Sequence, residues 1–173
     1  MANLIRPGST TGNAVILRDA QRPGTPMVDL TRIWRGRIVV ANDFTAAAQS
    51  QALDLRAMFA NTNPIPEDID VWSPKVDLVQ VVAGGGITTA TVILGETTPV
   101  NDTDGYLTST NVFTGATLGW KDTPAAALYG PRYRPLFTPL LQLDVGVGTV
   151  AGATSGVFDV TFKYSLTPSH RAA

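Results

Sequence analysis

Cysteine is absent from this chain of 173 residues, and histidine occurs once, at position 170. Without cysteine the chain can form no disulfide, present no thiolate nucleophile and build no cysteine-ligated metal site. A catalytic imidazole needs fixed neighbours that set its tautomer and pKa, whereas His170 lies in the polar SHRAA segment at the C-terminus. Serine hydrolase triads, two-histidine zinc sites and histidine acid–base chemistry are therefore excluded.

Lysine and glutamate are also scarce. The chain holds three lysines and two glutamates, against 16 glycines and 12 prolines. Proteins built of long helices usually place lysine and glutamate freely on exposed faces, whereas glycine, proline and threonine favour turns and strands. This balance predicts an all-β fold, and 173 residues suffice for one domain with a sizeable core.

Long apolar runs are missing as well. No run approaches the roughly 18 apolar residues of a transmembrane helix, and the N-terminal segment MANLIRPGSTTGN lacks the apolar centre of a signal peptide. We therefore expect a protein that is made in the cytoplasm and has no membrane partner.

The stretch from Trp72 to Gly95 is the centre of the predicted fold. Apolar and polar residues alternate over 76–81, and residues 87–94 consist largely of Thr, Val and Ile beyond the break at Gly84-Gly85-Gly86. β-Branched residues pack well on a pleated surface and lose rotamer freedom in a helix. We expect two strands here, joined in a hairpin by the glycine turn.

Further strands are expected on both sides of this hairpin. Residues 28–41 predict two short strands, or one strand with a bulge at Arg35-Gly36. Residues 44–59 fit a helix by their alanine content and a strand by their alternation, so both readings stay open. Short strand pieces are expected over 106–120.

Two more strands close the chain, over 140–147 and 156–166. In GVFDVTFKYSL the alternation of large apolar with smaller or polar residues is the cleanest in the sequence. It predicts that Phe158, Val160, Phe162 and Tyr164 face the core.

Three stretches carry residues that could bind or react, and each fits a loop better. Asn101–Gly105 places carboxylates at alternate positions before a glycine, but residue 112 is valine where a calcium loop requires glutamate. Gly146–Gly152 has the spacing GxGxxxG with no helix to follow. The acidic cluster at 67–70 lies in a proline loop and is typical of a solvated face. We predict no catalytic residue, no cofactor site and no metal ligand, and hence no enzyme.

Charge is unevenly distributed although the net charge is only −1. Up to residue 37 there are six arginines and two aspartates, a balance of +4 that leaves −5 for the rest. Residues 1–28 hold three prolines and one short apolar run, so they cannot bury enough surface to fold alone. We predict an extended N-terminal arm over 1–28, a β-sandwich domain over 29–168 and a polar tail over 169–173. The arm is expected to order on a partner, or else to be a frayed terminus.

Two groups of residues are candidates for binding that partner. The arm supplies Arg6, Arg18 and Arg22, and an acidic protein surface is a better match for them than nucleic acid because no aromatic platform accompanies them. The second group lies in the YGPRYRP segment, a stiff surface loop with residue types that are enriched at interface hot spots. Its members are Tyr129, Arg132, Tyr133 and Arg134. The same loop could stack on sugar rings or simply cover the end of the sandwich.

Three long segments carry a resemblance to a known family. They are GRIVVANDFTAAAQSQALDLRAMFANTNPIPEDIDVWSPKVDLVQVV, TATVILGETTPVNDTDGYLTSTNV and GVFDVTFKYSL, and they span roughly residues 36–166. In strand order and amino-acid pattern they resemble the small β-sandwich structural proteins of tailed-phage virions. The most specific part of the likeness is Ala90–Val112. The chain departs from that pattern in its long loop before Pro139 and in its arginine-bearing arm.

The resemblance implies an antiparallel, jelly-roll-like β-sandwich that attaches to capsid or tail proteins through arms and loops, and it implies no catalytic residues. It favours a polar loop over 43–50 followed by a strand over 51–59. We expect a capsid decoration (cement) protein of the virion that is made in the host cytoplasm. It is expected to form a homo-oligomer, a trimer or dimer, and to bind the major capsid protein or other virion proteins. The alternatives are a head–tail adaptor or tail component, and a carbohydrate-binding module that uses Trp72, Tyr129 and Tyr133.

Overall fold

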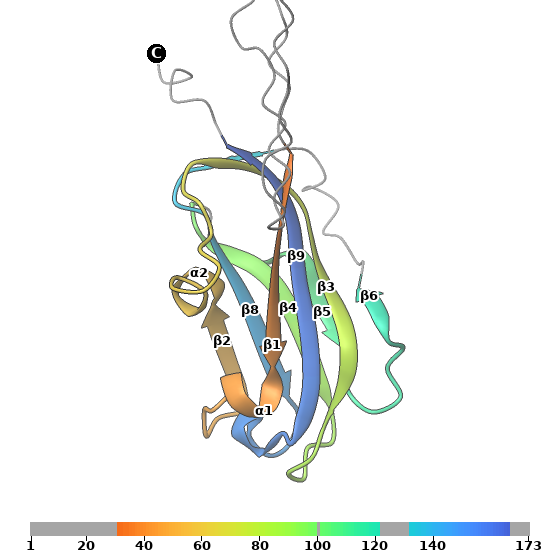
Figure 1. The fold of residues 1–173 in the computed structure, drawn as a ribbon. Coiled ribbons are helices and arrows are strands. Elements are labelled where there is room, and N and C mark those ends of the chain that lie inside the picture. The colour runs from red at the N-terminus through yellow and green to blue at the C-terminus, as the bar shows by residue number, and fades with distance from the viewer. Residues whose placement is uncertain (1–30, 100, 122–131, 167–173) are drawn as a thin grey trace, which may run out of the picture.

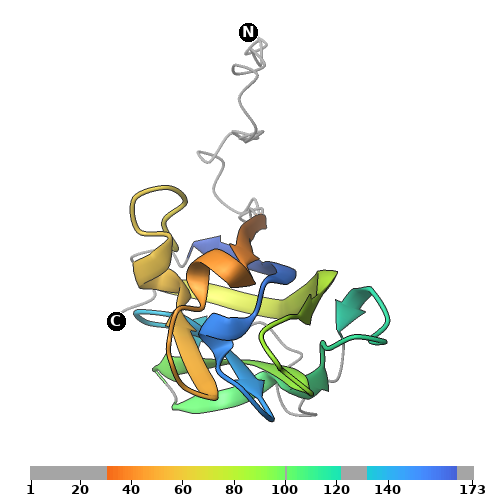
Figure 2. The same cartoon turned by 90° about the horizontal axis from the view of Figure 1, so that it is seen from below.

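The chain forms two β-sheets packed face to face, described by a computed structural model for residues 31–99, 101–121 and 132–166 (Figure 1). Figure 2 looks along the strands and shows the two layers edge-on. All pairings between the named strands are antiparallel. The predicted all-β sandwich is confirmed, whereas the predicted arm over 1–28 and the tail over 169–173 lie outside the described residues.

One sheet has five strands and the other has four. The five-stranded sheet contains β1 (Arg32–Val39), β3 (Ile69–Ala83), β6 (Gly119–Lys121), β7 (Arg132–Arg134) and β9 (Ser155–Leu166). The four-stranded sheet contains β2 (Ser50–Asp54), β4 (Ala90–Thr98), β5 (Asp102–Asn111) and β8 (Thr138–Val145). The strand orders are β1-β9-β3-β6, with β7 also paired to β3, and β2-β8-β4-β5. The first and last strands of the described chain are therefore neighbours.

Helical structure is confined to single turns between strands. These are α1 (Val40–Asp43), α2 (Leu55–Met58) and the 3-10 turn η1 (Val150–Gly152). Within the described ranges, none of the helices has the length and apolar character needed to cross a bilayer.

Alternation along the strands builds the core between the sheets. Phe158, Val160, Phe162 and Tyr164 on β9 are buried, as predicted from the sequence. Phe162 stacks on Trp34 at 4.9 Å between ring centroids and meets Phe137 edge-on at 5.3 Å. Burial of apolar area of this kind contributes most of the stability of a sandwich.

The expected hairpin between residues 72 and 95 is wrong. Both strands form, but β3 pairs with β9 and β6 while β4 pairs with β8 and β5, so the chain passes from one sheet to the other at Gly84–Gly86. All three glycines have positive φ, and Gly85 lies directly against the backbone of Gly152. A side chain would not fit at position 85. Glycine suits a tight crossing between two sheets as well as it suits a hairpin turn, because it adopts positive φ without strain.

Residues 31–59 form one long strand and one short one. Arg32–Val39 is a single strand with an unbroken register to β9, so over residues 31–41 neither a second strand nor the bulge at Arg35-Gly36 is present. The strand expected over 51–59 is partly right, because β2 covers Ser50–Asp54 and then ends. The Asp54 carboxylate accepts a 3.0 Å hydrogen bond from the Ala57 N–H, which starts a helical turn in place of more strand.

The loop expected at Asn101–Gly105 is instead part of β5 from Asp102 onward. Leu94 pairs with Leu107 and Glu96 with Asp102, so four residues of β5 stand opposite the single residue Gly95. This wide bulge folds the backbone of residues 102 and 103 directly over Gly95. The close approach depends on the absence of a Cβ at that position.

Gly95→Ala is expected to destabilise the protein by about 1–3 kcal/mol, the usual cost of overpacking. A Cβ at position 95 would overlap the carbonyl groups of Asp102 and Thr103, which are backbone atoms and cannot simply rotate away. Chemical denaturation measures the effect, and Thr97→Ala, an exposed change on the same strand, is the control. Equal stability of the Gly95→Ala variant and the wild type would contradict the packing described here.

Candidate functional site

The outer face of the five-stranded sheet carries most of the exposed large side chains of its strands. The register places Ile33 beside Lys163 and Trp72 in one row, and Arg35 beside Thr161 and Lys75 in the next. A third row runs from Arg37 through Asp159 and Asp77 to Trp120. Charged and aromatic residues thus share one continuous surface, which we call the basic face.

Two apolar side chains on the basic face are unusually open to solvent. Ile33 is 54% exposed and Trp120 is 53% exposed. The ammonium group of Lys75 lies 5.8 Å from the centre of the Trp120 ring, within the range of a cation–π interaction. Tryptophan and arginine are enriched among the residues that anchor protein interfaces.

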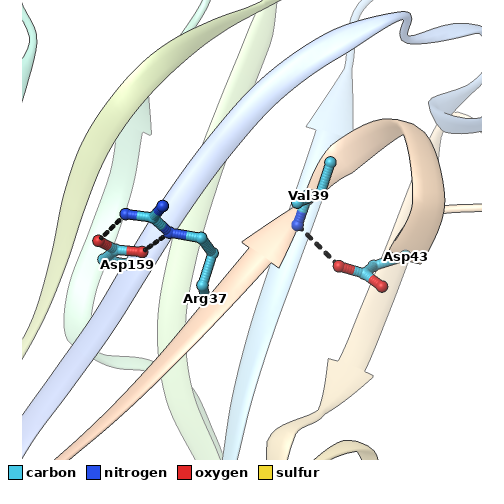
Figure 3. A network of polar contacts seen from close by, with 4 residues as sticks. All are labelled: Arg37, Val39, Asp43 and Asp159. Carbon is cyan, nitrogen blue, oxygen red and sulfur yellow. Dashed lines mark hydrogen bonds and ion pairs between the residues drawn. The ribbon is translucent and has the colours of Figure 1, made fainter.

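The Arg37–Asp159 pair joins β1 to β9 on this face (Figure 3). The guanidinium donates from Nε to one carboxylate oxygen at 2.7 Å and from Nη2 to the other at 2.8 Å. These hydrogen bonds, together with the charge of Arg37, hold the pKa of Asp159 below its ordinary value. The pair neutralises one of the three acidic groups on the basic face, the other two being Asp70 and Asp77.

The outer edge of the five-stranded sheet is partly closed by side chains. Asp43 accepts a 2.7 Å hydrogen bond from the Val39 N–H (Figure 3). Near the middle of β1, Asn63 donates to the Arg35 carbonyl at 2.7 Å, while the Trp34 indole donates to the Asn63 carbonyl at 2.9 Å. Side chains that satisfy edge carbonyl and N–H groups discourage the addition of a further strand. The face of the sheet is therefore a better docking surface than its edge.

A second polar group lies inside the sandwich and links the two sheets. Glu96 on β4 contacts Arg134 on β7 at 2.9 Å between Oε2 and Nε, and the Tyr106 hydroxyl donates to the same Oε2 at 2.7 Å. The exposed fractions of the three residues are 3%, 7% and 9%. We call these residues the buried polar cluster.

Burial governs the ionisation of the buried polar cluster. It raises the pKa of Glu96, although the hydrogen bond from Tyr106 and the charge of Arg134 oppose part of the rise. Burial also raises the pKa of the Tyr106 hydroxyl, which therefore stays protonated and serves as a donor. With so little exposed surface, the cluster has no access to a substrate, and its role is to connect the sheets.

The predicted partner-binding residues are only partly described. Arg6, Arg18, Arg22 and Tyr129 lie outside the described residues. Arg132, Tyr133 and Arg134 form β7, which pairs with Ile69–Val71, in place of the expected loop. The expected surface position of Arg134 is wrong, because Glu96 draws its guanidinium into the core. Contact of the other six residues with a partner stays a prediction.

Sequence reasoning did not single out Glu96 or Tyr106. A signal was present, because Ala90, Val92, Leu94 and Glu96 occupy alternate positions of one strand and share its inward face. A carboxylate at an inward position requires a buried partner. Which residue supplies the partner of Glu96 could not be known before β7 was placed beside β3.

Among the described residues, no group of three or more His, Cys, Asp and Glu side chains is arranged to hold a metal ion.

Comparison with known proteins gives a likeness in structure and none in sequence. No family model matches the chain. No curated protein matches it in sequence. The capsid asymmetric unit of cyanophage Pam1 is similar to it with 14% identity and a TM-score of 0.49, over 90% of this chain and 98% of the other.

Proposed function

We propose that the chain is a non-enzymatic structural protein of a tailed-phage virion, and specifically a decoration protein that stabilises the capsid lattice. The observation that carries this proposal is the strand order. With the short strand β7 set aside, β1-β9-β3-β6 faces β2-β8-β4-β5, and this order supports the jelly-roll-like sandwich that we propose. Viral capsid proteins are among the main users of that architecture. The resemblance of residues 36–166 to tailed-phage sandwich proteins points to the same class.

The proposed mechanism is burial of arm and loop surface between capsomers. Arg6, Arg18 and Arg22 would meet acidic groups on the capsid or on a sister subunit, and Tyr129, Arg132 and Tyr133 would add contacts. Each contact can be weak, because a lattice offers the same site many times and raises the effective concentration. A decoration protein therefore needs no single tight site.

A carbohydrate-binding module is the second candidate. Lectins also use the jelly-roll architecture, and Trp120 offers an exposed ring on the basic face. Trp72, the platform predicted from the sequence, is half-buried beside Lys163.

Within the virion class, a head–tail adaptor or tail component is the nearest alternative to a decoration protein. Rings of six or twelve copies would favour that alternative over dimers or trimers.

Deletion of residues 1–28 is expected to abolish or greatly weaken attachment to capsids of the phage that encodes the chain, while the sandwich stays folded. β1 begins at Arg32, so the deletion removes no described strand. Cosedimentation of purified protein with capsid particles measures the attachment. A full-length variant with Arg6, Arg18 and Arg22 changed to alanine separates the effect of charge from the effect of chain length. Attachment unchanged by the deletion would contradict the role of the arm.

A further inference from the structure

The two sheets of the sandwich carry opposite charge. The strands of the five-stranded sheet contain eight basic and three acidic residues. The basic residues are Arg32, Arg35, Arg37, Lys75, Lys121, Arg132, Arg134 and Lys163, and the acidic ones are Asp70, Asp77 and Asp159. The strands of the four-stranded sheet contain no lysine or arginine. Their acidic residues are Asp54, Glu96, Asp102, Asp104 and Asp144. The molecule is therefore electrically polarised across its two layers.

The polarity persists on the outer faces, where charge can reach a partner. The strand pattern directs four basic side chains and three acidic ones to the basic face, which leaves one excess positive charge. The basic ones are Arg35, Arg37, Lys75 and Lys163, and the acidic ones are Asp70, Asp77 and Asp159. Asp159 is neutralised by Arg37. Arg35 and Lys163 are exposed and form no ion pair within the described parts of the chain. This face thus keeps an excess of positive charge.

The opposite face, on the four-stranded sheet, carries mostly small or polar side chains and acidic charge. One row runs from Ser50 through Asp144 and Thr91 to Asn111. The next contains Ala52, Gln142 and Ile93, and Asp54 lies at the end of β2. Asp144 and Asp54 are the charged groups of these rows, and no strand of the sheet carries a cation to offset them. We call this surface the acidic face.

We propose that the basic face of one copy docks on the acidic face of a second copy. The excess charges are opposite, which aligns two copies during encounter and disfavours docking of like faces. The exposed side chains of Ile33 and Trp120 can then cover the small residues Ser50, Ala52 and Thr91 on the acidic face. Docking through the faces also agrees with the side-chain closure of the β1 edge by Asn63 and Asp43.

The proposed contact joins two different surfaces, so it is heterologous. Figure 2 shows the two sheets as opposite layers, and each bound copy therefore still presents one face of each charge. Such association continues into a stack unless the rotation between neighbours closes a ring. Its strength falls with salt, because the range of charge interactions shrinks from about 10 Å at 0.1 M to about 3 Å at 1 M. The inference stands whether or not the chain belongs to a virion.

A pair of charge-reversed full-length variants tests the contact. The first, Arg35→Glu with Lys163→Glu, makes the basic face acidic; the second, Ala52→Lys with Asp144→Lys, makes the acidic face basic. Each variant alone then presents two faces of the same sign, and its self-association should weaken by at least about tenfold, a change equivalent to about 1.4 kcal/mol. An equimolar mixture of the two should associate again, because the charges are complementary between the variants. The control adds two glutamates in exposed loops, Thr62→Glu with Thr114→Glu, and should associate like the wild type.

Sedimentation velocity at low and high salt gives the readout. Salt-sensitive association of the wild type, its loss in each variant and its return in the mixture would support the proposal. The return also shows that both variants are folded. A wild type that stays monomeric at low salt would overturn the proposed contact. Association that persists in both variants would overturn it too, and would direct attention to another surface such as the segment 1–30.

Discussion

Arg134→Met is expected to lower the free energy of unfolding by about 3–5 kcal/mol, the range found when one partner of a buried ion pair is removed. The change leaves Glu96, which is 3% exposed, without the cation that compensates its charge. Tyr106 still donates its hydrogen bond to Glu96, but a neutral donor cannot offset the loss of the positive charge. Equilibrium denaturation at neutral pH measures the effect.

The loss should depend on pH in a defined direction. Removing Arg134 takes away the charge and hydrogen bond that oppose the rise in the pKa of Glu96, so this pKa rises further in the variant. A folded state that binds a proton more tightly than the unfolded chain loses stability as pH rises. The deficit of the variant should therefore be small below the ordinary glutamate value of about 4.3 and grow as pH increases above it. A deficit independent of pH would contradict this account.

Two further variants separate burial from charge pairing. Glu96→Gln combined with Arg134→Met removes both charges and should recover much of the stability, since neutral replacements of buried pairs are often well tolerated. Arg37→Met breaks the exposed pair with Asp159 by the same substitution. Its effect should be much smaller, because solvent screens an exposed pair. It should also fade only in acid, as pH falls through the lowered pKa of Asp159.

The fold could be predicted from the sequence wherever a strand has one buried face. Alternation in β9 identified its four core residues, and the run of β-branched residues identified β4. Alternation does not state which strand lies beside which. The hairpin expected at Gly84–Gly86 was wrong for that reason, since a glycine turn within one sheet and a glycine crossing between sheets have the same local sequence.

The candidate surfaces could be predicted only in part, because they depend on strand neighbours. Arg35, Asp77 and Lys163 come from three strands that are distant in the sequence and adjacent in the sheet. The uneven charge along the chain was visible, but it was assigned to an arm and a body. The division that the structure reveals is between two sheets, which alternate along the chain. Counting charges by segment could not find it before the sheet order was known.

Phe162→Ala is expected to cost about 3–5 kcal/mol, the usual range for truncating a large aromatic side chain in a core. Phe162 lies at the centre of a row of rings: Trp34 stacks on one side at 4.9 Å, and Phe137 and Tyr164 lie at 5.3 and 6.1 Å. Removing the ring deletes these contacts and opens a cavity between two sheets that are held by strand pairing and can collapse only partly.

The same variant tests how the core and the buried polar cluster are connected. Phe137 contacts Phe162 and also meets Tyr106 edge-on at 6.2 Å, so a shift of Phe137 into the cavity would loosen the donor to Glu96. Loss of the Phe162 and Arg134 side chains together should therefore depart from additivity, as expected for residues that share a neighbour. Denaturation of the two single variants and the double variant measures the coupling. Thr161→Ala, the adjacent change on the opposite face of β9, should stay within about 0.5 kcal/mol of the wild type. Strict additivity would show that the two groups stabilise the sandwich independently.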